Sequence, residues 1–311
     1  MMKKNKILNH LLVERINKII VETSGINDEL DSRIMDVANY IISQSKKEKN
    51  YKHEDNLSYY SGSLKDNLFN KDFVFYYTIL KFNNEEEYNG YINKYGELND
   101  GFWKDKDRYF IKLYLVLIDG RFNYRDFYDG IYHEVEHAFQ TIKSGKDFGG
   151  ENLNAYIRSK LRDKNIWERV IAEIIYATRK NEQDAMVNGM WGYVNSQLKQ
   201  NAKYWDVDKL IIDSEASVWL KKLYDNIALI LTNKDNEKLM KVIDYYSHNF
   251  DINYGRLLSI TKKGIKAFEE KIAKVTRRLK QKHYNNVNEY ISSRRIIGER
   301  GKKYCLRLIF D

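Results

Sequence analysis

The sequence predicts an α+β protein in which a small antiparallel or mixed sheet is followed by a mostly helical part. Two runs rich in aromatic and β-branched residues, 73–82 and 109–118, are typical of strands. From Tyr124 to about residue 260 the apolar residues recur instead with the 3.6-residue period of helices. The first of these helices carries the run His-Glu-Val-Glu-His, shortly after the second strand.

The segments before and between these strands are less regular. The first 45 residues are predicted to be helical, whereas residues 46–72, rich in Lys, Asn, Asp and Ser, are predicted to be a loop or exposed linker. The segment around 91–98 is expected to add a third strand or a hairpin. Two apolar stripes indicate the N-terminal helices: Ile7, Leu11, Leu12, Ile16 and Ile19, then Leu30, Ile34, Val37 and Ile41.

The composition is that of a soluble, globular chain. Of the 311 residues, 43% are hydrophobic and 31% are charged, and no apolar run approaches the roughly 18 residues needed to cross a bilayer. Residues 1–20 begin with lysines but lack the unbroken apolar stretch of a signal peptide. The single cysteine, Cys305, suits a reducing compartment. We therefore expect a cytoplasmic protein without a membrane span.

The net charge of +9 is concentrated at the C-terminal end. Residues 262–311 hold 15 Lys and Arg against 5 Asp and Glu, a balance of +10, so the rest of the chain is near neutral. This segment is predicted to be a basic helix that packs on the body, contacts nucleic acid or an anionic surface through 262–303, or pairs with a partner helix. A short strand is expected at 304–310. The apolar seam of the helix is formed by Ile265, Phe268, Ile272, Val275 and Leu279.

The His-Glu-Val-Glu-His run at 133–137 fits the pattern HExxH. On a helix over 127–143, His133 and His137 project from one side, opposite an apolar stripe, and can converge on a zinc ion. Glu134 can then take a proton from a metal-bound water as general base. The alternative is that both histidines are ordinary core or surface residues.

Two imidazoles do not complete a catalytic zinc site, which usually has three protein ligands. The long motif of metzincins would require Gly at 140 and His at 143, and Gln140 and Lys143 exclude it. Glu136 points away from the histidine pair and is interpreted as solvated or as supporting the ligands from outside. The third ligand must therefore come from another part of the chain.

Glu182 is the best candidate for the third ligand. It lies on the apolar face of a helix predicted over 166–197, and a carboxylate there is costly unless it is paired or binds a metal. Gly189 on the same face would let another helix approach closely. Asp184 or Glu173 as ligand, and a buried salt bridge from Glu182 to Lys or Arg, remain alternatives, and the run 179–181 could break the helix.

These two motifs together resemble the gluzincin branch of zinc metallopeptidases. In that branch an HExxH helix is joined to a downstream helix whose glutamate, in an Asn-Glu-x-x-Ala/Ser setting, is the third ligand, and this chain has Asn181-Glu182-Gln183-Asp184-Ala185. The resemblance covers about residues 110–190. It implies His133, His137 and Glu182 as ligands of one zinc ion and Glu134 as general base. For the oxyanion-stabilising group the candidates, by residue type only, are Tyr193, Tyr245, Tyr246 and His248.

The resemblance implies a zinc-dependent peptidase acting on a protein or peptide, with a zincin-like metallopeptidase domain over 61–260. Residues 1–60 would form an N-terminal helical region, and 261–311 a basic helical C-terminal segment. The strand 109–118 would offer an edge beside the metal to an extended substrate, or be an ordinary strand of the sheet. The alternative functions are a non-catalytic zincin-like protein and a nucleic-acid-associated binding or structural protein of a larger assembly.

Overall fold

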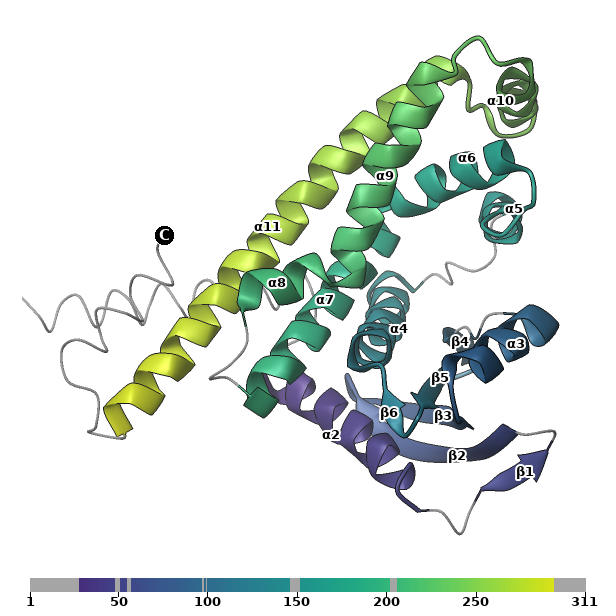
Figure 1. Cartoon of the computed structure of the whole chain (residues 1–311). Coiled ribbons are helices and arrows are strands. Elements are labelled where there is room, and N and C mark those ends of the chain that lie inside the picture. The colour runs from purple at the N-terminus through teal and green to yellow at the C-terminus, as the bar shows by residue number, and fades with distance from the viewer. Residues whose placement is uncertain are drawn as a thin grey trace, which may run out of the picture.

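The computed structural model describes residues 28–47, 51–54, 57–96, 98, 100–145, 152–201 and 206–293. Within these residues the chain is α+β, with one mixed sheet and a larger helical part (Figure 1). This confirms the predicted order of a small sheet followed by helices. The apolar stripe predicted at 7–19 and the short strand predicted at 304–310 lie outside the described residues.

The sheet has the strand order β1-β2-β3-β5-β4, and β6 pairs with the end of β5. The two predicted strands are confirmed as β3 (Lys71–Phe82) and β5 (Arg108–Ile118), which pair in parallel. The other pairings are antiparallel. They involve β1 (Lys52–Glu54), β2 (Leu57–Leu68), β4 (Gly101–Asp105) and β6 (Arg121–Phe122).

The predicted loop at 46–72 is wrong, because β2 occupies most of its second half. Alternate residues of β2 face the core, but Gly62 and Asp66 stand among them, so the apolar alternation that marks a strand is diluted. Gly62 is required by packing. A Cβ there would lie 2.4 Å from the hydroxyl oxygen of Tyr77 on the neighbouring strand.

The strand or hairpin predicted around 91–98 is also wrong, because α3 (Glu85–Tyr95) is a helix. Asn84 caps its first turn by accepting a hydrogen bond from the backbone N–H of Glu87, and Gly96 ends it with a φ of 87°. α3 makes the crossover that two parallel strands require. It covers one end of the sheet, where Phe82 packs against Tyr88 and Tyr91.

The face of the sheet opposite α3, which we call the inner face, packs against α2 (Asp28–Gln44) and α4 (Tyr124–Ser144). The predicted stripe of α2 is buried, as are Ile131, Val135 and Ala138 of the stripe predicted for α4. α4 thus lies between the sheet and the helical part (Figure 1). The inner face is built from Phe73, Phe75, Tyr77, Ile79, Ile111, Leu113 and Leu115.

The helical part is arranged around α7 and the long α11. None of its described helices, nor any other described helix, combines the length and apolar character needed to cross a membrane. α11 runs along α7 and α9 (Figure 1). The elements are α5 (Asn152–Lys160), α6 (Ile166–Ala177), α7 (Lys180–Asn201), α8 (Val207–Ile212), α9 (Glu215–Thr232), α10 (Glu237–Phe250) and α11 (Tyr254–Ser293).

α11 contains the predicted basic helix and uses its apolar seam within the chain. Part of its charge also neutralises acids of the body: Lys271 pairs with Asp184 at 2.8 Å and Lys280 with Asp208 at 2.6 Å. Of the predicted roles of the basic helix, these contacts favour packing on the body for the part that includes Lys271 and Lys280. The seam comprises the buried Phe268 and Leu279 and the partly buried Ile265, Ile272 and Val275.

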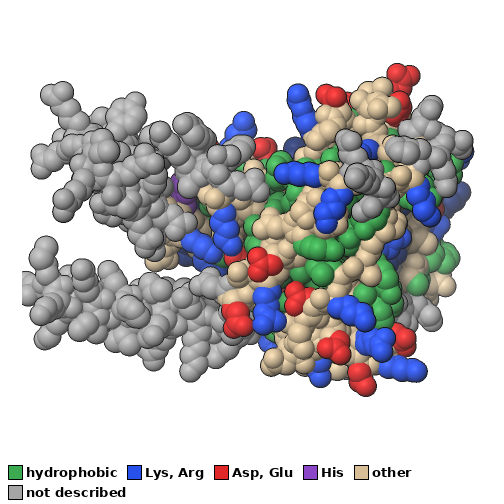
Figure 2. Space-filling model, turned by 90° about the horizontal axis from the view of Figure 1, so that it is seen from below, with side chains coloured by type: hydrophobic (Ala, Val, Ile, Leu, Met, Phe, Trp, Pro, Cys, Tyr) green, Lys and Arg blue, Asp and Glu red, His purple; other side chains and the backbone are tan. Residues whose placement is uncertain are grey.

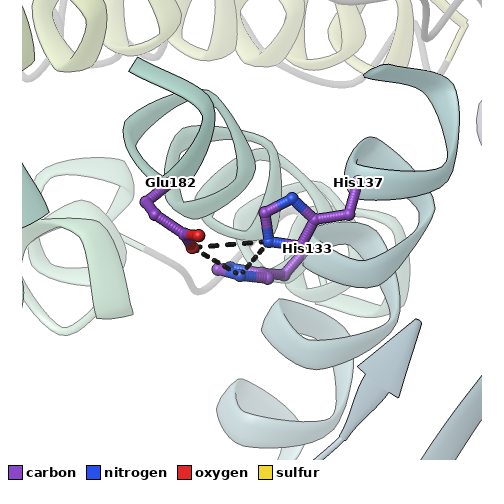
Figure 3. Close-up of side chains that lie close together, drawn as sticks. All are labelled: His133, His137 and Glu182. Atoms are coloured by element: carbon purple, nitrogen blue, oxygen red, sulfur yellow. Dashed lines mark hydrogen bonds and ion pairs between the residues drawn. The ribbon is translucent and has the colours of Figure 1, made fainter. Parts of the chain in front are cut away.

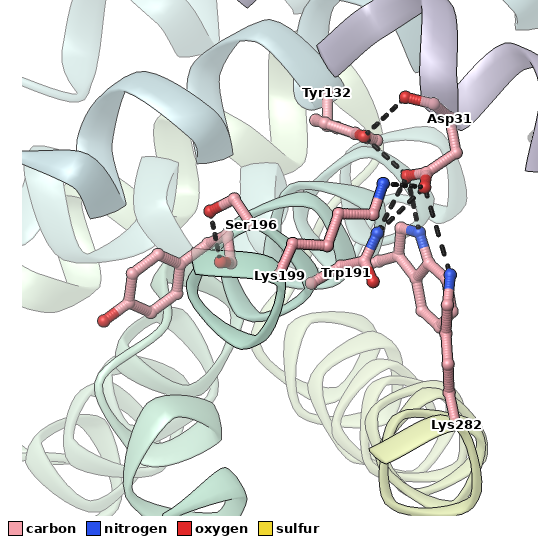
Figure 4. Close-up of polar contacts among 8 residues, drawn as sticks. Asp31, Tyr132, Trp191, Ser196, Lys199 and Lys282 are labelled. Carbon is pink, nitrogen blue, oxygen red and sulfur yellow. Dashed lines mark hydrogen bonds and ion pairs between the residues drawn. The ribbon is translucent and has the colours of Figure 1, made fainter. Parts of the chain in front are cut away.

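A buried carboxylate, Asp31, ties α2 to α4 and α7 (Figure 4). The hydroxyl of Tyr132 donates to it at 2.6 Å, and the amide of Asn195 donates at 2.9 Å. Lys199 and the indole N–H of Trp191 donate at 3.0 and 3.3 Å. Because Tyr132 directly precedes His133, this network fixes α4 next to the histidine pair.

Candidate metal centre

The predicted HExxH helix is confirmed as α4. Asn123 caps its N-terminus by accepting from the backbone N–H of Asp126, and Gly145 ends it in the left-handed region with a φ of 67°. His133 is buried and His137 half-buried. Their Nε2 atoms lie 3.0 Å apart, so the two imidazoles converge as the spacing predicts.

The helix predicted over 166–197 is wrong as a single element, because it breaks between α6 and α7. The N–H and hydroxyl of Thr178 both donate to the carbonyl of Ile174, which closes α6. The side chain of Gln183 then donates to the last carbonyl of α6, at Ala177, at 3.0 Å. α7 therefore begins at Lys180, and Glu182 lies in its first turn rather than in the middle of a long helix.

Two glycines bring α7 against α4. A Cβ at Gly189 would lie 2.9 Å from the backbone oxygen of Asp129, and one at Gly192 would lie 2.1 Å from the ring of Tyr132. Real Cβ atoms essentially never approach a neighbour so closely. The close approach predicted at Gly189 is thus confirmed, and it carries the first turn of α7 to the histidines.

The structure brings His133, His137 and Glu182 together into a group that could hold a metal ion (Figure 3). The Oε2 atom of Glu182 lies 3.4 Å from His137 Nε2 and 3.7 Å from His133 Nε2. One ligand atom from each residue lies within 4.8 Å of the others. Oε2 of Glu182 and Nδ1 of His133 are buried without a hydrogen-bond partner. Buried polar atoms rarely lack a partner, so this group fits a bound cation better than a self-contained hydrogen-bond network.

The electrostatics of the group also fit a cation. Burial raises the pKa of Glu182, but His133 and His137 outweigh it and hold that pKa well below its ordinary range. Burial lowers the pKa of His133, whereas Glu182, Glu134 and Glu215 raise it to about 9. A proton on His133 therefore balances the carboxylate, and a metal would take its place.

An outer layer of amides supports His137. The Oε1 atom of Gln140 lies 3.4 Å from Nδ1 of His137, and its amide nitrogen donates to Glu136 at 3.1 Å and to the backbone oxygen of Asn181 at 3.2 Å. Asn188 donates to the other oxygen of Glu136 at 2.6 Å. Glu136 is buried, so of its two predicted roles the solvated one is wrong. Such outer contacts orient ligands in metal sites.

The alternatives to Glu182 have other partners. Asp184 forms the ion pair with Lys271, and Glu173 is paired with Lys222 at 2.9 Å and accepts from Asn226 at 2.9 Å. The proposed salt bridge from Glu182 to a basic side chain is also wrong. Among the described residues its ion-pair partners are the two histidines alone.

Tyr176, at the end of α6, is a residue of this site that the sequence did not reveal. Burial raises the pKa of its hydroxyl well above its ordinary value, and the negative charge of Glu182 raises it further, so the group stays protonated at neutral pH. Glu134 and Glu215 act on the same hydroxyl. Its ring packs on Trp219, with centroids 5.5 Å apart. Because the helix break lies between Tyr176 and Glu182, no periodicity relates them.

The four oxyanion candidates chosen by residue type lie elsewhere. Tyr245 and Tyr246 pack with Tyr156 on the far end of the helical part. His248, on α10, has Nδ1 2.7 Å from the carbonyl of Asp244. Tyr193 interacts with Asp213 and Asp129 rather than with the three clustered side chains.

β5 offers only a short open edge near α4. β4 pairs with its residues 108–112 and β6 with 117–118, and among the described residues no strand covers 113–116 on that side. There Asp100 accepts the backbone N–H of Tyr114 at 2.8 Å and lies against Gly130 of α4. Burial, and then Glu134, raise the pKa of Asp100 to about 8.

Comparisons with protein-family models, with curated proteins and with solved structures give no match to this chain. The resemblance to gluzincins therefore rests on the two motifs and on the group that they form in space. The fold is α+β with a small mixed sheet, and no solved structure connects it to the zincins.

Proposed function

We propose that this chain is a zinc-dependent peptidase in which His133, His137 and Glu182 hold one zinc ion and Glu134 is the general base. The observation that carries the proposal is the convergence of the three donor atoms, with the buried Oε2 of Glu182 lacking a hydrogen-bond partner. A buried carboxylate without Lys or Arg is expensive unless it coordinates a metal.

The donor set favours zinc, with a fourth position left for water. Two histidines and one carboxylate also bind Fe(II) in oxygenases. Glu134 is half-buried and directly follows His133. It favours hydrolysis, because a hydrolase needs a general base beside the metal-bound water, whereas an oxygenase centre needs only the three ligands. The outer contacts of Gln140 and Glu136 complete the support that metal ligands need.

In this proposal the residues of the chain divide the work of peptide hydrolysis. Bound zinc would lower the pKa of its water and polarise the scissile carbonyl. Glu134 would take the proton from the attacking water and deliver it to the leaving amine. Tyr176, whose hydroxyl stays protonated and interacts with the charge of Glu182, is our candidate donor for the developing oxyanion.

A protein or peptide substrate is supported by the open stretch of β5. On the side not covered by a described strand, Asp100 occupies the N–H of Tyr114, and an extended peptide that displaces Asp100 could pair with the backbone at 113–116 as an added strand.

The test uses the purified full chain, analysed for zinc and iron and assayed on a fluorescently labelled unfolded protein. We expect one zinc per chain and hydrolysis that a chelator blocks. Glu134→Gln should keep the zinc and lose at least about 10²-fold in turnover, the lower end of general-base effects, whereas His137→Ala should lose both. Glu237→Gln on the exposed start of α10 is the matched control and should change neither.

Three results would refute the proposal or part of it. Full hydrolysis by Glu134→Gln would remove the assigned base, and stoichiometric iron would change the reaction class. Stoichiometric zinc, lost in His137→Ala, with no hydrolysis of any unfolded protein would instead identify a non-catalytic zinc protein of a larger assembly.

A further inference from the structure

The outer face of the sheet, opposite α2 and α4, carries three aromatic rings from three neighbouring strands, two of them exposed and one half-buried. They are Tyr76 of β3, Phe110 of β5 and Trp103 of β4, which we call the aromatic platform. Their planes lie within 10° of parallel, with centroids 5.3 Å apart for Trp103 and Phe110 and about 6 Å apart for the other pairs. Tyr76 and Trp103 are each 41% exposed.

The platform is a surface and not part of the core. α3 covers the other end of this face, where Phe82 packs against Tyr88 and Tyr91, and leaves the platform open among the described residues. In the view from below, the molecule exposes apolar side chains surrounded by both basic and acidic side chains (Figure 2). Large rings held parallel at a surface mark a binding site rather than a packing necessity.

Two lysines stand on the same face as the platform. Lys112 is opposite Tyr76 across the β3–β5 pair, and Lys65 is opposite Val74 across the β2–β3 pair. Both are exposed, and within the described part of the chain neither forms an ion pair with a carboxylate. Two acids also face outward: Asp105 is opposite Arg108, and Asp72 is opposite Asn67 beside Lys65. Around the rings the basic side chains Lys65, Lys112 and Arg108 thus outnumber the two acids.

We propose that the aromatic platform binds single-stranded nucleic acid. Exposed parallel rings on a sheet stack with bases of any sequence, and neighbouring lysines bind the phosphates between them. A carbohydrate would use the rings but not the exposed lysines, so the excess of basic side chains favours the polyanion. The site lies on the opposite face of the sheet from the metal group and does not depend on the proposed peptidase activity.

The experiment measures binding of the full chain to fluorescein-labelled dT20 and U20 by anisotropy at low salt. Trp103→Ala and Tyr76→Ala should each weaken binding by roughly 10-fold or more, since one stacked base contributes about that factor. Tyr76→Phe keeps the ring and should retain wild-type affinity. Tyr245→Ala, a tyrosine 42% exposed on α10, is the matched control and should bind like wild type.

The contribution of the lysines is read from the salt dependence. Lys65→Glu and Lys112→Glu should each lower the slope of log affinity against log salt by about 0.7, the value for one phosphate contact on a single strand. Lys263→Glu, exposed on the basic α11, tests the competing surface and should leave the slope near wild type.

Several outcomes would overturn the proposal. They are no binding of either strand by the wild-type chain, unchanged affinity in both alanine variants of the platform, and a loss of affinity in Lys263→Glu alone. Binding of a neutral polysaccharide, or a dimer that Trp103→Ala dissociates, with no nucleic-acid affinity would assign the platform to another partner.

Discussion

Gly192→Ala should separate the two helices that form the candidate metal centre. The added Cβ would lie 2.1 Å from the ring of Tyr132, whereas ordinary contact begins near 3.4 Å, so the atoms must part by about 1.3 Å. Tyr132 cannot swing aside, because it is fully buried and its hydroxyl donates to Asp31 at 2.6 Å. The shift therefore falls on α4 and α7 themselves.

The expected cost follows from overpacking in a closed interface, about 1–3 kcal/mol of unfolding free energy. The same movement would carry Glu182 away from the histidines by a distance several times the ±0.2 Å that metal–ligand bonds tolerate. Gly192→Ala should thus lose both stability and zinc. The effect on zinc should persist at temperatures where the variant is still fully folded.

Urea unfolding and zinc content of the purified variant test this expectation together. Gly90→Ala is the matched control, because Gly90 lies within α3 and a Cβ there meets nothing within 4 Å. That control should gain about 0.8–1.0 kcal/mol from helix propensity and keep its zinc. If Gly192→Ala unfolded like wild type and bound zinc stoichiometrically, the close contact of α4 with α7 would not hold the site together.

Three further perturbations separate the roles of neighbouring residues. Glu182→Gln should weaken zinc binding by more than the roughly 10–100-fold that loss of an outer contact costs, while Asp184→Asn, two residues along α7, should keep it, both read by competition with a chelating dye. Gln140→Ala removes only the outer contact to the imidazole and should weaken zinc binding by roughly 10–100-fold with an unchanged circular-dichroism spectrum. Asp31→Ala leaves buried donors unpaired and should lower the unfolding free energy by about 1–3 kcal/mol at pH 7, against little change for the exposed Asp36→Ala. Burial raises the pKa of Asp31, but its hydrogen-bond and lysine partners lower that pKa below 3.8. The stability that Asp31 contributes is therefore present above pH 3.8 and should fade as the pH drops further. An undiminished difference in unfolding free energy between wild type and Asp31→Ala at about pH 2 would contradict this assignment.

The histidine pair could be predicted because its signal is local. Residues four apart on a helix share a face, and the apolar residues of α4 fix which face is left for His133 and His137. The strands β3 and β5 were equally predictable, since aromatic and β-branched residues dominate both. Local patterns of this kind need no knowledge of the rest of the fold.

Elements with a mixed composition were missed for two different reasons. β2 has one face in solvent and a glycine opposite Tyr77, so its pairing partner rather than its own sequence makes it a strand. α3 carried readable caps, Asn84 before three glutamates and Gly96 at the end, but the tyrosines within it suggested a strand. Tyr176 was beyond reach because only the break after α6 brings it to Glu182.

Glu182 was predicted on a single helix over 166–197 that is in fact two helices, and yet it lies beside the two histidines as expected. The prediction used two premises: a carboxylate among apolar residues needs a charged partner, and small residues after it allow a close helix. Neither premise requires α6 and α7 to be continuous. The close contacts at Gly189 and Gly192 fix α7 on α4 about two and three turns after Glu182, and Gln183 caps α6 at the break. The break thus adds Tyr176 to the site, while the contact between α4 and α7 alone sets the distance from Glu182 to the histidines.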